Sequence, residues 1–444
     1  MSTTLQPPLW VQGGSLQSYE ELDGRPVMTD VAIAGGSFAG LALALALARC
    51  LDGGLAVTVV DRGGRSDVGS AGPDPRAVAL SASSRRMLEA LGLWKGVASS
   101  AQPVQRIEIT DSSLDAGIRP VLLAWNNRIS DGKKTGEVSQ EETAAHIVPL
   151  HVLGQVLGAA VAAERSITVI RPAEVVGINS DAFFIRLKLA DNTEVPARLA
   201  VGADGHRSVL RDRAGIKSVG WPYAQVGIAT TVVHERDHDG VAVQHFLPAG
   251  PFAILPLPGR RSCVTWTESE TEGRRIMALD DDGFLAELDR RFGGRLGELR
   301  LDGGRRCWPL SMHLARRYVS NRLALVGDAA HGVHPIAGQG LNLAFRDVAA
   351  LTETIVDGAR NGLDIGDATM LTRYERWRRF DATAATAAFD AINILFSRDG
   401  RLTRSVREAG LQLVDRFPVL KRELVREAAG VTGELPLLLQ GKLA

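Results

Sequence analysis

The feature that most constrains this chain is an apolar stretch from Val31 to Ala48, 18 residues without a charge, which glycines interrupt within its first ten residues. Its length is at the lower limit for a helix that crosses a bilayer. However, a short VAIA segment precedes the glycines and a smooth LALALALA pattern follows them, which predicts a buried strand, a glycine turn and a buried helix. A second apolar segment, Leu55–Val60, ends in Asp61. We therefore reject a membrane span and predict a βαβ unit of about 30 residues, the size that a crossover to a parallel strand requires.

The glycine turn has the spacing of a dinucleotide-binding fingerprint. In GGSFAG the pattern G-x-G-x-x-G falls on Gly35, Ser37 and Gly40, and Asp61 follows 21 residues after Gly40. The first glycine permits the tight turn, the last permits close packing of helix on strand, and the helix N-terminus offers free N–H groups to a pyrophosphate. Ser37 departs from the pattern where the backbone should approach the phosphates, and an ordinary glycine turn is the alternative. The predicted nucleotide contacts are Gly35, Gly36, Ser37, Phe38, Ala39, Gly40, Asp61 and Arg62.

Two further segments combine glycines with acids, namely Val201–Arg211 (VGADGHRSVLR) and Leu323–Asn342 (LALVGDAAHGVHPIAGQGLN). In this order the three segments resemble the dinucleotide fingerprint, the DG motif and the GD motif of the single-component flavin aromatic monooxygenases, which have the p-hydroxybenzoate hydroxylase fold. More narrowly, His334–Asp347 (HPIAGQGLNLAFRD) resembles the signature of the ubiquinone-biosynthesis FAD-dependent hydroxylases. Ala344 stands where that signature has its last glycine.

The resemblance implies a bound FAD with defined contacts. It places Arg76, in the segment DPRAVALS, near the flavin, Asp204 at the pyrophosphate and Asp328 at the ribityl chain. It also suggests that Arg207 assists docking of the reductant. The residues by themselves leave alternatives open, because Arg76 could be a surface charge and Asp204 could form a structural ion pair with Arg207.

The GD segment also favours a flavin on physical grounds. Leu323–Val326 is a short apolar strand whose carboxyl end leads into Gly327 and Asp328, and open parallel sheets bind ligands at that edge. The following glycines predict a turn that opens a helix near Leu341, whose N–H groups suit the negative charge of a reduced isoalloxazine. The predicted cofactor contacts here are Gly327, Asp328, Gly338, Gln339, Gly340, Leu341 and Asn342, and Pro335 and Ile336 would then border the substrate.

His331 and His334 are three residues apart beside Asp328, a spacing that a metal site could use. We predict no metal, because no third ligand of matching character is near in sequence and the glycines indicate a planar ligand held against backbone. No G-x-S-x-G elbow occurs at a strand end, so a hydrolase has no support. We assign no catalytic side chain.

The segments between the motifs have a different pattern of apolar and polar residues. From Tyr223 to Trp266, short apolar or alternating runs are separated by Gly, Pro and Asp, which predicts an antiparallel sheet, and a helix over 281–293 and a strand over 305–314 follow. Asn126–Glu142 is polar and without period, which predicts a mobile surface excursion that could act as a lid.

The fold class that we expect is α/β, a discontinuous Rossmann-like FAD-binding domain with an inserted antiparallel-sheet substrate domain and a C-terminal helical tail. The expected boundaries are 29–100, 145–215 and 318–390 for the FAD-binding domain, 101–144 and 216–317 for the substrate domain, 391–444 for the C-terminal helices and 1–28 for a disordered leader.

Composition narrows the partners and the compartment. Lys and Arg number 51 and so do Asp and Glu, so the net charge is 0 and no global field would gather nucleic acid. Three cysteines without a CxxC pair fit a reducing cytoplasm. The first 28 residues hold one basic residue and no periodic apolar pattern, which predicts neither a signal peptide nor a transit peptide.

The C-terminal tail combines charge with apolar residues. From Arg398 to Arg426 eight residues are basic and four are acidic, and the apolar side would consist of Leu411, Leu413, Val414, Phe417 and Leu420. Such a run is usually a solvated helix face. The alternative hypothesis is contact with anionic lipid on the inner membrane face, where a polyprenyl substrate would be held.

The resemblance implies an FAD-dependent monooxygenase of ubiquinone biosynthesis that hydroxylates the ring of a polyprenylated phenol or quinone precursor with O₂, through a flavin C4a-hydroperoxide. Other proteins of that pathway are the expected partners. NAD(P)H or an external reductase would donate the electrons, since no second dinucleotide fingerprint occurs. Three alternatives stay open: a hydroxylase for a soluble phenol or polyketide, a polyprenyl reductase, and a non-catalytic flavin-binding assembly partner.

Overall fold

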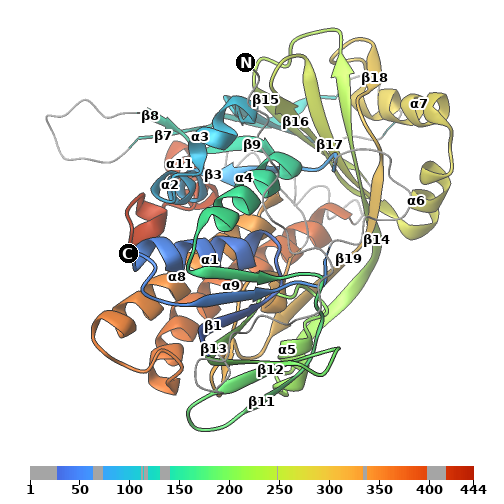
Figure 1. The fold of residues 1–444 in the computed structure, drawn as a ribbon. Coiled ribbons are helices and arrows are strands. Elements are labelled where there is room, and N and C mark those ends of the chain that lie inside the picture. The colour runs from blue at the N-terminus through green and yellow to red at the C-terminus, as the bar shows by residue number, and fades with distance from the viewer. Residues whose placement is uncertain are drawn as a thin grey trace, which may run out of the picture.

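The computed structural model describes residues 28–63, 74–111, 114, 119–130, 141–247, 249–333, 338–397 and 417–444. Two large sheets organise these residues, and most of the helices surround the first of them (Figure 1). The predicted leader, apart from Met28, and residues 398–416 of the tail lie outside the described part.

The first sheet has eight strands and contains the predicted βαβ unit. β1 (Thr29–Ala34) lies between β2 (Val57–Val60) and β13 (Glu194–Gly202) and runs parallel to both. The remaining strands are the parallel β10 (Ile167–Ile170) and β21 (Leu323–Leu325) and the antiparallel β11 (Val175–Ser180), β12 (Ile185–Leu189) and β20 (Val319–Ser320). Because α1 (Phe38–Cys50) connects β1 to β2, the prediction for this segment is confirmed.

Helix α1 is buried on nearly every side. Nine of its thirteen residues are buried, so the helix has no wide polar face and needs neighbours all round. Those neighbours are α4 (Leu150–Ala163) and α8 (Gly340–Arg360), and α9 (Ala368–Ser397) packs against α8 in turn. The apolar sequence of α1 therefore reflects the core of the parallel-sheet part and not a bilayer.

The second sheet has nine strands in the order β22-β19-β14-β17-β16-β15-β5-β6, with β18 beside β14. Their bounds are β5 (Arg106–Asp111), β6 (Val121–Asn126), β14 (Ser218–His234), β15 (Val241–Leu247), β16 (Gly250–Leu257), β17 (Arg261–Ser269), β18 (Leu299–Leu301), β19 (Arg306–Ala315) and β22 (His331–Gly332). The pairs are antiparallel except β5 with β15. The predicted antiparallel sheet is confirmed, and so are the strand at 305–314 and the helix at 281–293, which is α7 (Asp281–Phe292).

An aromatic core joins this sheet to α7 and α6 (Glu270–Met277). Trp266 on β17 stacks on Phe284 of α7, with ring centroids 5.7 Å apart and an interplanar angle of 18°. Phe252 on β16 tilts against the same indole. Aromatic pairs of this kind add roughly 0.5–1.5 kcal/mol beyond their buried area.

Short elements connect the two sheets. They are β3 (Ala77–Ser81), α2 (Ala82–Ala90), α3 (Trp94–Val97), η1 (Ala98–Ser100), β4 (Gln102–Pro103), β9 (Ala145–Pro149), α5 (Val209–Arg213) and η2 (Gly327–Ala329). The division of the chain into two domains at the boundaries given above stays a prediction.

The segment Asn126–Glu142 differs in part from its prediction. Its two ends form an antiparallel hairpin of β7 (Arg128–Ser130) and β8 (Glu141–Thr143), which the lack of a sequence period did not predict. Glu142 pairs with Arg85 and Arg86 of α2, which ties the hairpin to the body of the protein. Residues 131–140 lie outside the described part.

The C-terminal segment returns to the parallel-sheet part. α11 (Pro418–Ala428) and η4 (Leu437–Gln440) follow α9, and η4 packs against α2 and α8. Arg360 at the end of α8 donates to the carbonyl of Ala444 at 2.9 Å. Among the residues that the structure describes, we find no helix with the length and apolar character to cross a membrane.

Candidate functional site

The glycine and acid motifs meet at one edge of the first sheet. Strand register places Ala34, the last residue of β1, beside both Val60 of β2 and Gly202 of β13, and Gly202 lies beside Leu325 of β21. The loops that follow these four strand ends carry the fingerprint, Asp61, the DG motif and the GD motif. The tertiary structure thus brings together segments that are almost 300 residues apart, at the edge where parallel sheets bind ligands.

The fingerprint turn is as tight as its glycines require. Gly35 has a φ of +107°, and a β-carbon there would lie 2.2 Å from the carbonyl oxygen of Ala203. A β-carbon on Gly40 would lie 1.9 Å from the Gly35 oxygen, so α1 closes directly on the turn. Ser37 has a φ of −96°, which any residue adopts, and it caps α1 with no side-chain hydrogen bond and no acid in the first turn. The departure from the fingerprint at Ser37 is therefore compatible with the turn, and the first amides of α1 remain available to an anion.

Asp61 supports the glycine turn and lies at the same edge of the first sheet. Its Oδ1 accepts from the Gly36 amide at 3.3 Å, and its Oδ2 pairs with Arg171 at 3.0 Å. A β-carbon on Gly36 would approach the Asp61 side chain to 2.8 Å, which explains why glycine stands there. Arg62 is exposed. The predicted contact of Asp61 with a ribose stays a prediction.

The DG motif contains a carboxylate with an unused acceptor. Asp204 Oδ2 accepts from the Leu210 amide at 3.2 Å, whereas Oδ1 is buried without a hydrogen-bond partner, and burial raises the pKa of this carboxyl. Within the described residues Asp204 and Arg207 form no ion pair, so the structural alternative for this motif loses its main support. A buried acceptor without a partner indicates a missing donor, such as a ligand hydroxyl or an ordered water.

The GD motif forms a tight turn that carries an exposed carboxylate. Gly327 has a φ of +57°, and η2 begins at this residue. The side chain of Asp328 is solvent-accessible, yet desolvation by the surrounding protein is the largest effect on its carboxyl and raises its pKa. A carboxylate can accept hydrogen bonds from a polyol, and the contact of Asp328 with a ribityl chain stays a prediction.

The GQGLN segment leads into α8, and its contact with a flavin stays a prediction. α8 begins at Gly340 with no side-chain cap and no acid in its first turn. Asn342 turns its side chain inward, where Oδ1 accepts from the Ser81 amide at 3.0 Å and from Ser84 Oγ at 2.8 Å. Gly338, Gln339 and Leu341 are half-buried. Only the backbone of Asn342 is then left for a ligand. The described residues do not include His334, Pro335 and Ile336.

Arg76 is paired, not a free surface charge. Its Nε and Nη2 both donate to Asp74, at 3.0 and 2.6 Å, and its guanidinium lies 5.5 Å from the centroid of Trp308 on β19. A β-carbon on Gly227 of β14 would lie 2.8 Å from the Trp308 ring, so the indole lies flat between the strand and the arginine. Arg76 is thus fixed between the two sheets, and its proximity to a flavin stays a prediction.

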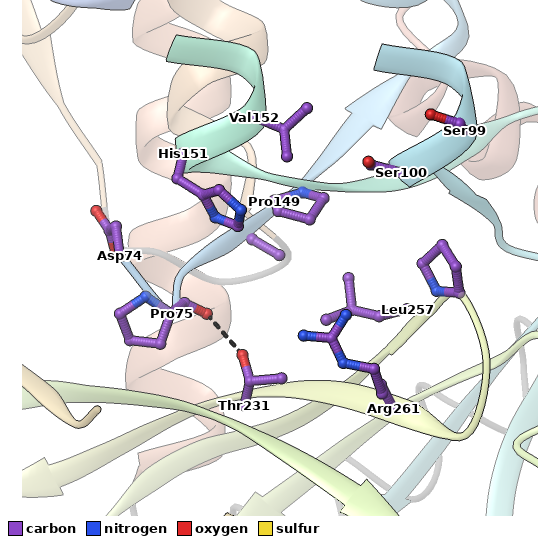
Figure 2. A pocket seen from close by; sticks show the side chains of 12 residues that line it. Asp74, Pro75, Ser99, Ser100, Pro149, His151, Val152, Thr231, Leu257 and Arg261 are labelled. Carbon is purple, nitrogen blue, oxygen red and sulfur yellow. Dashed lines mark hydrogen bonds between the residues drawn. The ribbon is translucent and has the colours of Figure 1, made fainter. Parts of the chain in front are cut away.

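Beside this segment lies a cavity of 230 Å³ (Figure 2). His151 at the start of α4 and Arg261 at the start of β17 point into it from opposite sides. Thr231 forms part of its wall and donates to the Pro75 carbonyl at 3.2 Å. Sequence reasoning did not identify His151 or Arg261, because neither belongs to a motif and only the packing of α4 over the second sheet brings them together.

Sequence reasoning also missed the anchor of the GD turn. Asp347 of α8 is completely buried and accepts from the Gly327 amide at 2.9 Å, from His331 Nε2 at 2.6 Å and from Arg378 Nε at 2.8 Å. Burial alone would raise the pKa of Asp347, but His331 and Arg378 together lower it below its usual value. The available signal was Asp347 itself, the acid that ends the His334–Asp347 signature.

Comparison with known proteins agrees with this geometry. The model of a family described as "FAD binding domain" matches residues 28–388. A ubiquinone hydroxylase of Rhodospirillum rubrum is 40% identical over 417 residues, which are 93% of both chains. The 3-demethoxyubiquinol 3-hydroxylase of Escherichia coli is 32% identical over 91% of this chain and 99% of its own. Among solved structures, p-nitrophenol 4-monooxygenase of Pseudomonas putida superposes with a TM-score of 0.72 over 92% of this chain and 99% of its own, at 18% identity, and shows the shared fold.

Proposed function

Because the chain belongs to the FAD-binding-domain family and is an FAD-dependent monooxygenase, we propose that it hydroxylates the aromatic ring of a polyprenylated phenol or quinone precursor in ubiquinone biosynthesis. The observation that carries the proposal is the 40% identity with a ubiquinone hydroxylase over 93% of both chains. The 3-demethoxyubiquinol 3-hydroxylase supports the same substrate class.

The residues at the sheet edge fit FAD. Gly35 and Gly40 leave a turn that no side chain could occupy, Asp204 Oδ1 lacks a donor, and Asp328 presents an exposed carboxylate. These features would receive the pyrophosphate and the polyol of one extended ligand. When bound, FAD supplies the activation of O₂ for transfer to an electron-rich ring.

The chain itself binds, orients and excludes water. We infer that the N-terminal amides of α1 hold the pyrophosphate and that Asp328 accepts from the ribityl hydroxyls. The amides at the start of α8, near Gly340, would face negative charge on the ring system. The second sheet would enclose the substrate, with Pro335 and Ile336 at its border, so that the oxidant meets the ring and not water.

We also propose that the protein is cytoplasmic and contacts the inner membrane face through its C-terminal helices. In α11 and just before it, Phe417, Val419 and Leu424 are 55%, 69% and 50% exposed. The neighbouring Arg422 is exposed as well. Flotation of the intact chain and of a truncation after Ser397 on vesicles that contain anionic lipid tests this, since equal flotation of both would reject it.

The decisive experiment supplies the holoenzyme with a polyprenylated phenol in lipid and an electron donor, either NAD(P)H or an external reductase. We expect O₂ uptake in a fixed ratio to hydroxylated product. Turnover of a small phenol without lipid at a higher kcat/KM would favour the soluble-substrate alternative. Reduction of prenyl double bonds without O₂ uptake, or no turnover at all, would overturn the proposal.

A genetic test addresses the cofactor contact separately. Deletion of the gene should cause a quinone precursor to accumulate, and its mass identifies the missing hydroxylation. We expect Asp328→Ala to fail to restore the product. Full rescue by this variant, with flavin retained, would contradict the assignment of Asp328 to the ribityl chain.

A further inference from the structure

Two histidines from different sheets meet beside the GD turn. His206 lies in the loop between β13 and α5, two residues after Asp204, and His313 lies on β19 of the second sheet. Their Nδ1 atoms are 2.6 Å apart, and the rings are nearly perpendicular with centroids separated by 4.2 Å. His313 Nε2 lies 2.7 Å from the carbonyl oxygen of Asp328.

The chemistry of these contacts determines which ring nitrogens carry a hydrogen. A carbonyl oxygen only accepts, so His313 Nε2 carries a hydrogen and donates to Asp328. A neutral His313 then has a lone pair on Nδ1, and His206 Nδ1 must donate to it. Protonation of His206 on its other nitrogen would preserve this bond. Once His206 is protonated, a second proton on His313 would place two donors opposite each other.

The surroundings keep His313 neutral. Burial is the largest effect that lowers its pKa, to about 4, and the charges of His206, Arg211 and His331 act in the same direction. The bond to the Asp328 carbonyl acts against them. At neutral pH the bridge is therefore complete.

The bridge joins the two acid motifs to each other and to the second sheet. On one side, the loop of His206 begins at Ala203, whose amide donates to Ala34 at the end of β1 at 2.8 Å. On the other side, His313 holds Asp328 by its backbone. Gly332 of β22 leaves room for the ring, because a β-carbon there would lie 2.4 Å from His313 Nδ1.

We propose that His206 and His313 are positioning residues that lock the Asp204 loop and the Asp328 turn in the spacing that FAD requires. The inference rests on FAD binding and not on the identity of the aromatic substrate. Loops that are already held in the bound geometry lose less conformational entropy when the ligand binds. Loss of the bridge should therefore weaken retention of the flavin. Neither imidazole needs to touch the cofactor for this effect.

The test measures release of FAD from the holoenzyme, followed by recovery of flavin fluorescence on dilution at pH 7.5. Loss of one neutral hydrogen bond predicts that His206→Ala raises the Kd for FAD about five-fold. Because His206 is exposed, the fold should persist, and Lys217→Ala, at an exposed position directly before β14, is the control. An unchanged Kd in His206→Ala would overturn the proposal.

Variants at His313 separate bonding from packing. Gln carries both a donor and an acceptor, so His313→Gln should retain FAD better than His313→Leu, which has neither. Equal loss in both would mean that only the volume of the ring matters, and the bridge would be rejected.

The pH dependence of FAD binding tests the bridge directly, because residues that act only through packing would not change it. In the wild-type holoenzyme the Kd for FAD should rise as the pH falls toward about 4, where His313 gains a proton and the bridge breaks. In His206→Ala no donor opposes that proton, so this acid limb should flatten. An identical acid limb in the two proteins would overturn the proposal.

Discussion

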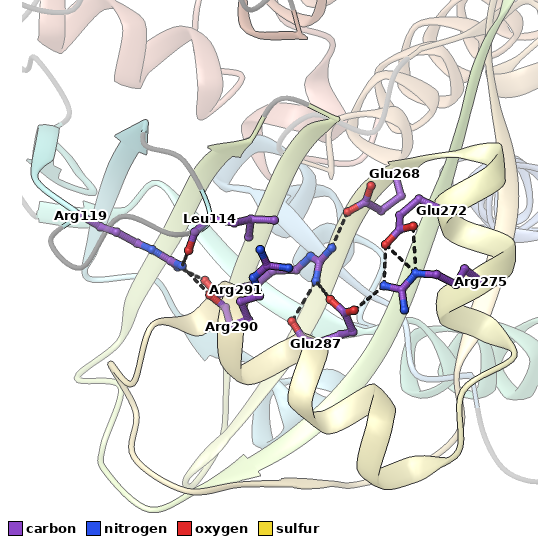
Figure 3. A network of polar contacts seen from close by, with 8 residues as sticks. All are labelled: Leu114, Arg119, Glu268, Glu272, Arg275, Glu287, Arg290 and Arg291. Atoms are coloured by element: carbon purple, nitrogen blue, oxygen red, sulfur yellow. Dashed lines mark hydrogen bonds and ion pairs between the residues drawn. The ribbon is translucent and has the colours of Figure 1, made fainter.

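Two buried charge networks differ in which group is shared. Behind the second sheet, Arg291 of α7 serves two carboxylates, Glu268 at 2.7 Å and Glu287 at 2.5 Å (Figure 3). Its guanidinium also lies 4.5 Å from the centroid of the Trp266 ring. Under the GD turn the arrangement is reversed, because one carboxylate, Asp347, serves three donors. We call these the Arg291 network and the Asp347 network.

The difference determines both the charge and the role of each network. Burial raises the pKa of Glu268 and Arg291 only partly offsets this, whereas the donors around Asp347 lower its pKa despite complete burial. The partners of Arg291 are the Glu268 side chain on β17 and the side chain and carbonyl of Glu287 on α7, so that network fastens a helix to a sheet. One partner of Asp347 is the backbone of Gly327, so the Asp347 network holds the GD turn, which we propose faces the cofactor.

The largest effect should follow from Asp347→Ala. The change leaves the Gly327 amide, His331 Nε2 and Arg378 Nε without their acceptor in the core, and breaking a buried ion pair in this way costs roughly 3–5 kcal/mol. We expect a loss of that size in the free energy of unfolding by urea, together with release of FAD. A loss below about 1 kcal/mol would show that the Asp347 network does not support the turn.

Glu268→Ala should cost less, about 2 kcal/mol, because Arg291 keeps Glu287 and the Trp266 ring. FAD release distinguishes the two networks most clearly. In Glu268→Ala, FAD release measured by fluorescence should equal that of the wild type. Faster FAD release from Glu268→Ala would mean that the two networks are coupled, and the contrast between them would be broken.

The two networks should respond to pH with opposite sign. The pKa of Asp347 is lowered in the folded state, so its stabilisation is present above the usual 3.8 and is lost as the pH falls below it. The pKa of Glu268 is raised, so its contribution is largest below the usual 4.5 and is lost as the pH rises through the folded pKa. Urea unfolding between pH 3 and 7 should therefore show that the penalty of Asp347→Asn shrinks in acid while that of Glu268→Gln grows. Parallel trends would contradict this explanation.

The smallest effect is expected at the solvent end of the Arg291 network. Arg275 of α6 pairs with Glu272 at 2.6 Å and also with Glu287, but it is exposed, and such pairs contribute about 0–1 kcal/mol. Arg275→Ala should lower the urea midpoint slightly, and 1 M salt should remove the difference from the wild type. The adjacent Arg274→Ala is the control. A loss comparable to that of Glu268→Ala would show that the network acts as one cooperative unit.

Part of the sequence interpretation failed because its signal was short. The ends of Asn126–Glu142 contain only three residues per strand, too few to show an alternating pattern, and β8 is held by α2 arginines about 56 residues away. The roles of Asp347, His313 and the Asn342 side chain were equally invisible, since each depends on a partner far along the chain, as with Asn342 and Ser81 at a separation of 261 residues.

By itself, the sequence determined the order of the cofactor motifs and the strand–turn–helix units that carry them. Those features are local: Gly35 must adopt a positive φ, Gly40 must admit the helix, and an apolar strand must precede each acid. Only the tertiary structure decided which side chains anchor the loops, because sheet register and the packing of α8, α9 and β19 bring Asp347, Arg378 and His313 to the same edge. Contacts between distant segments depend on how whole elements pack against each other, and no local pattern of residues encodes them.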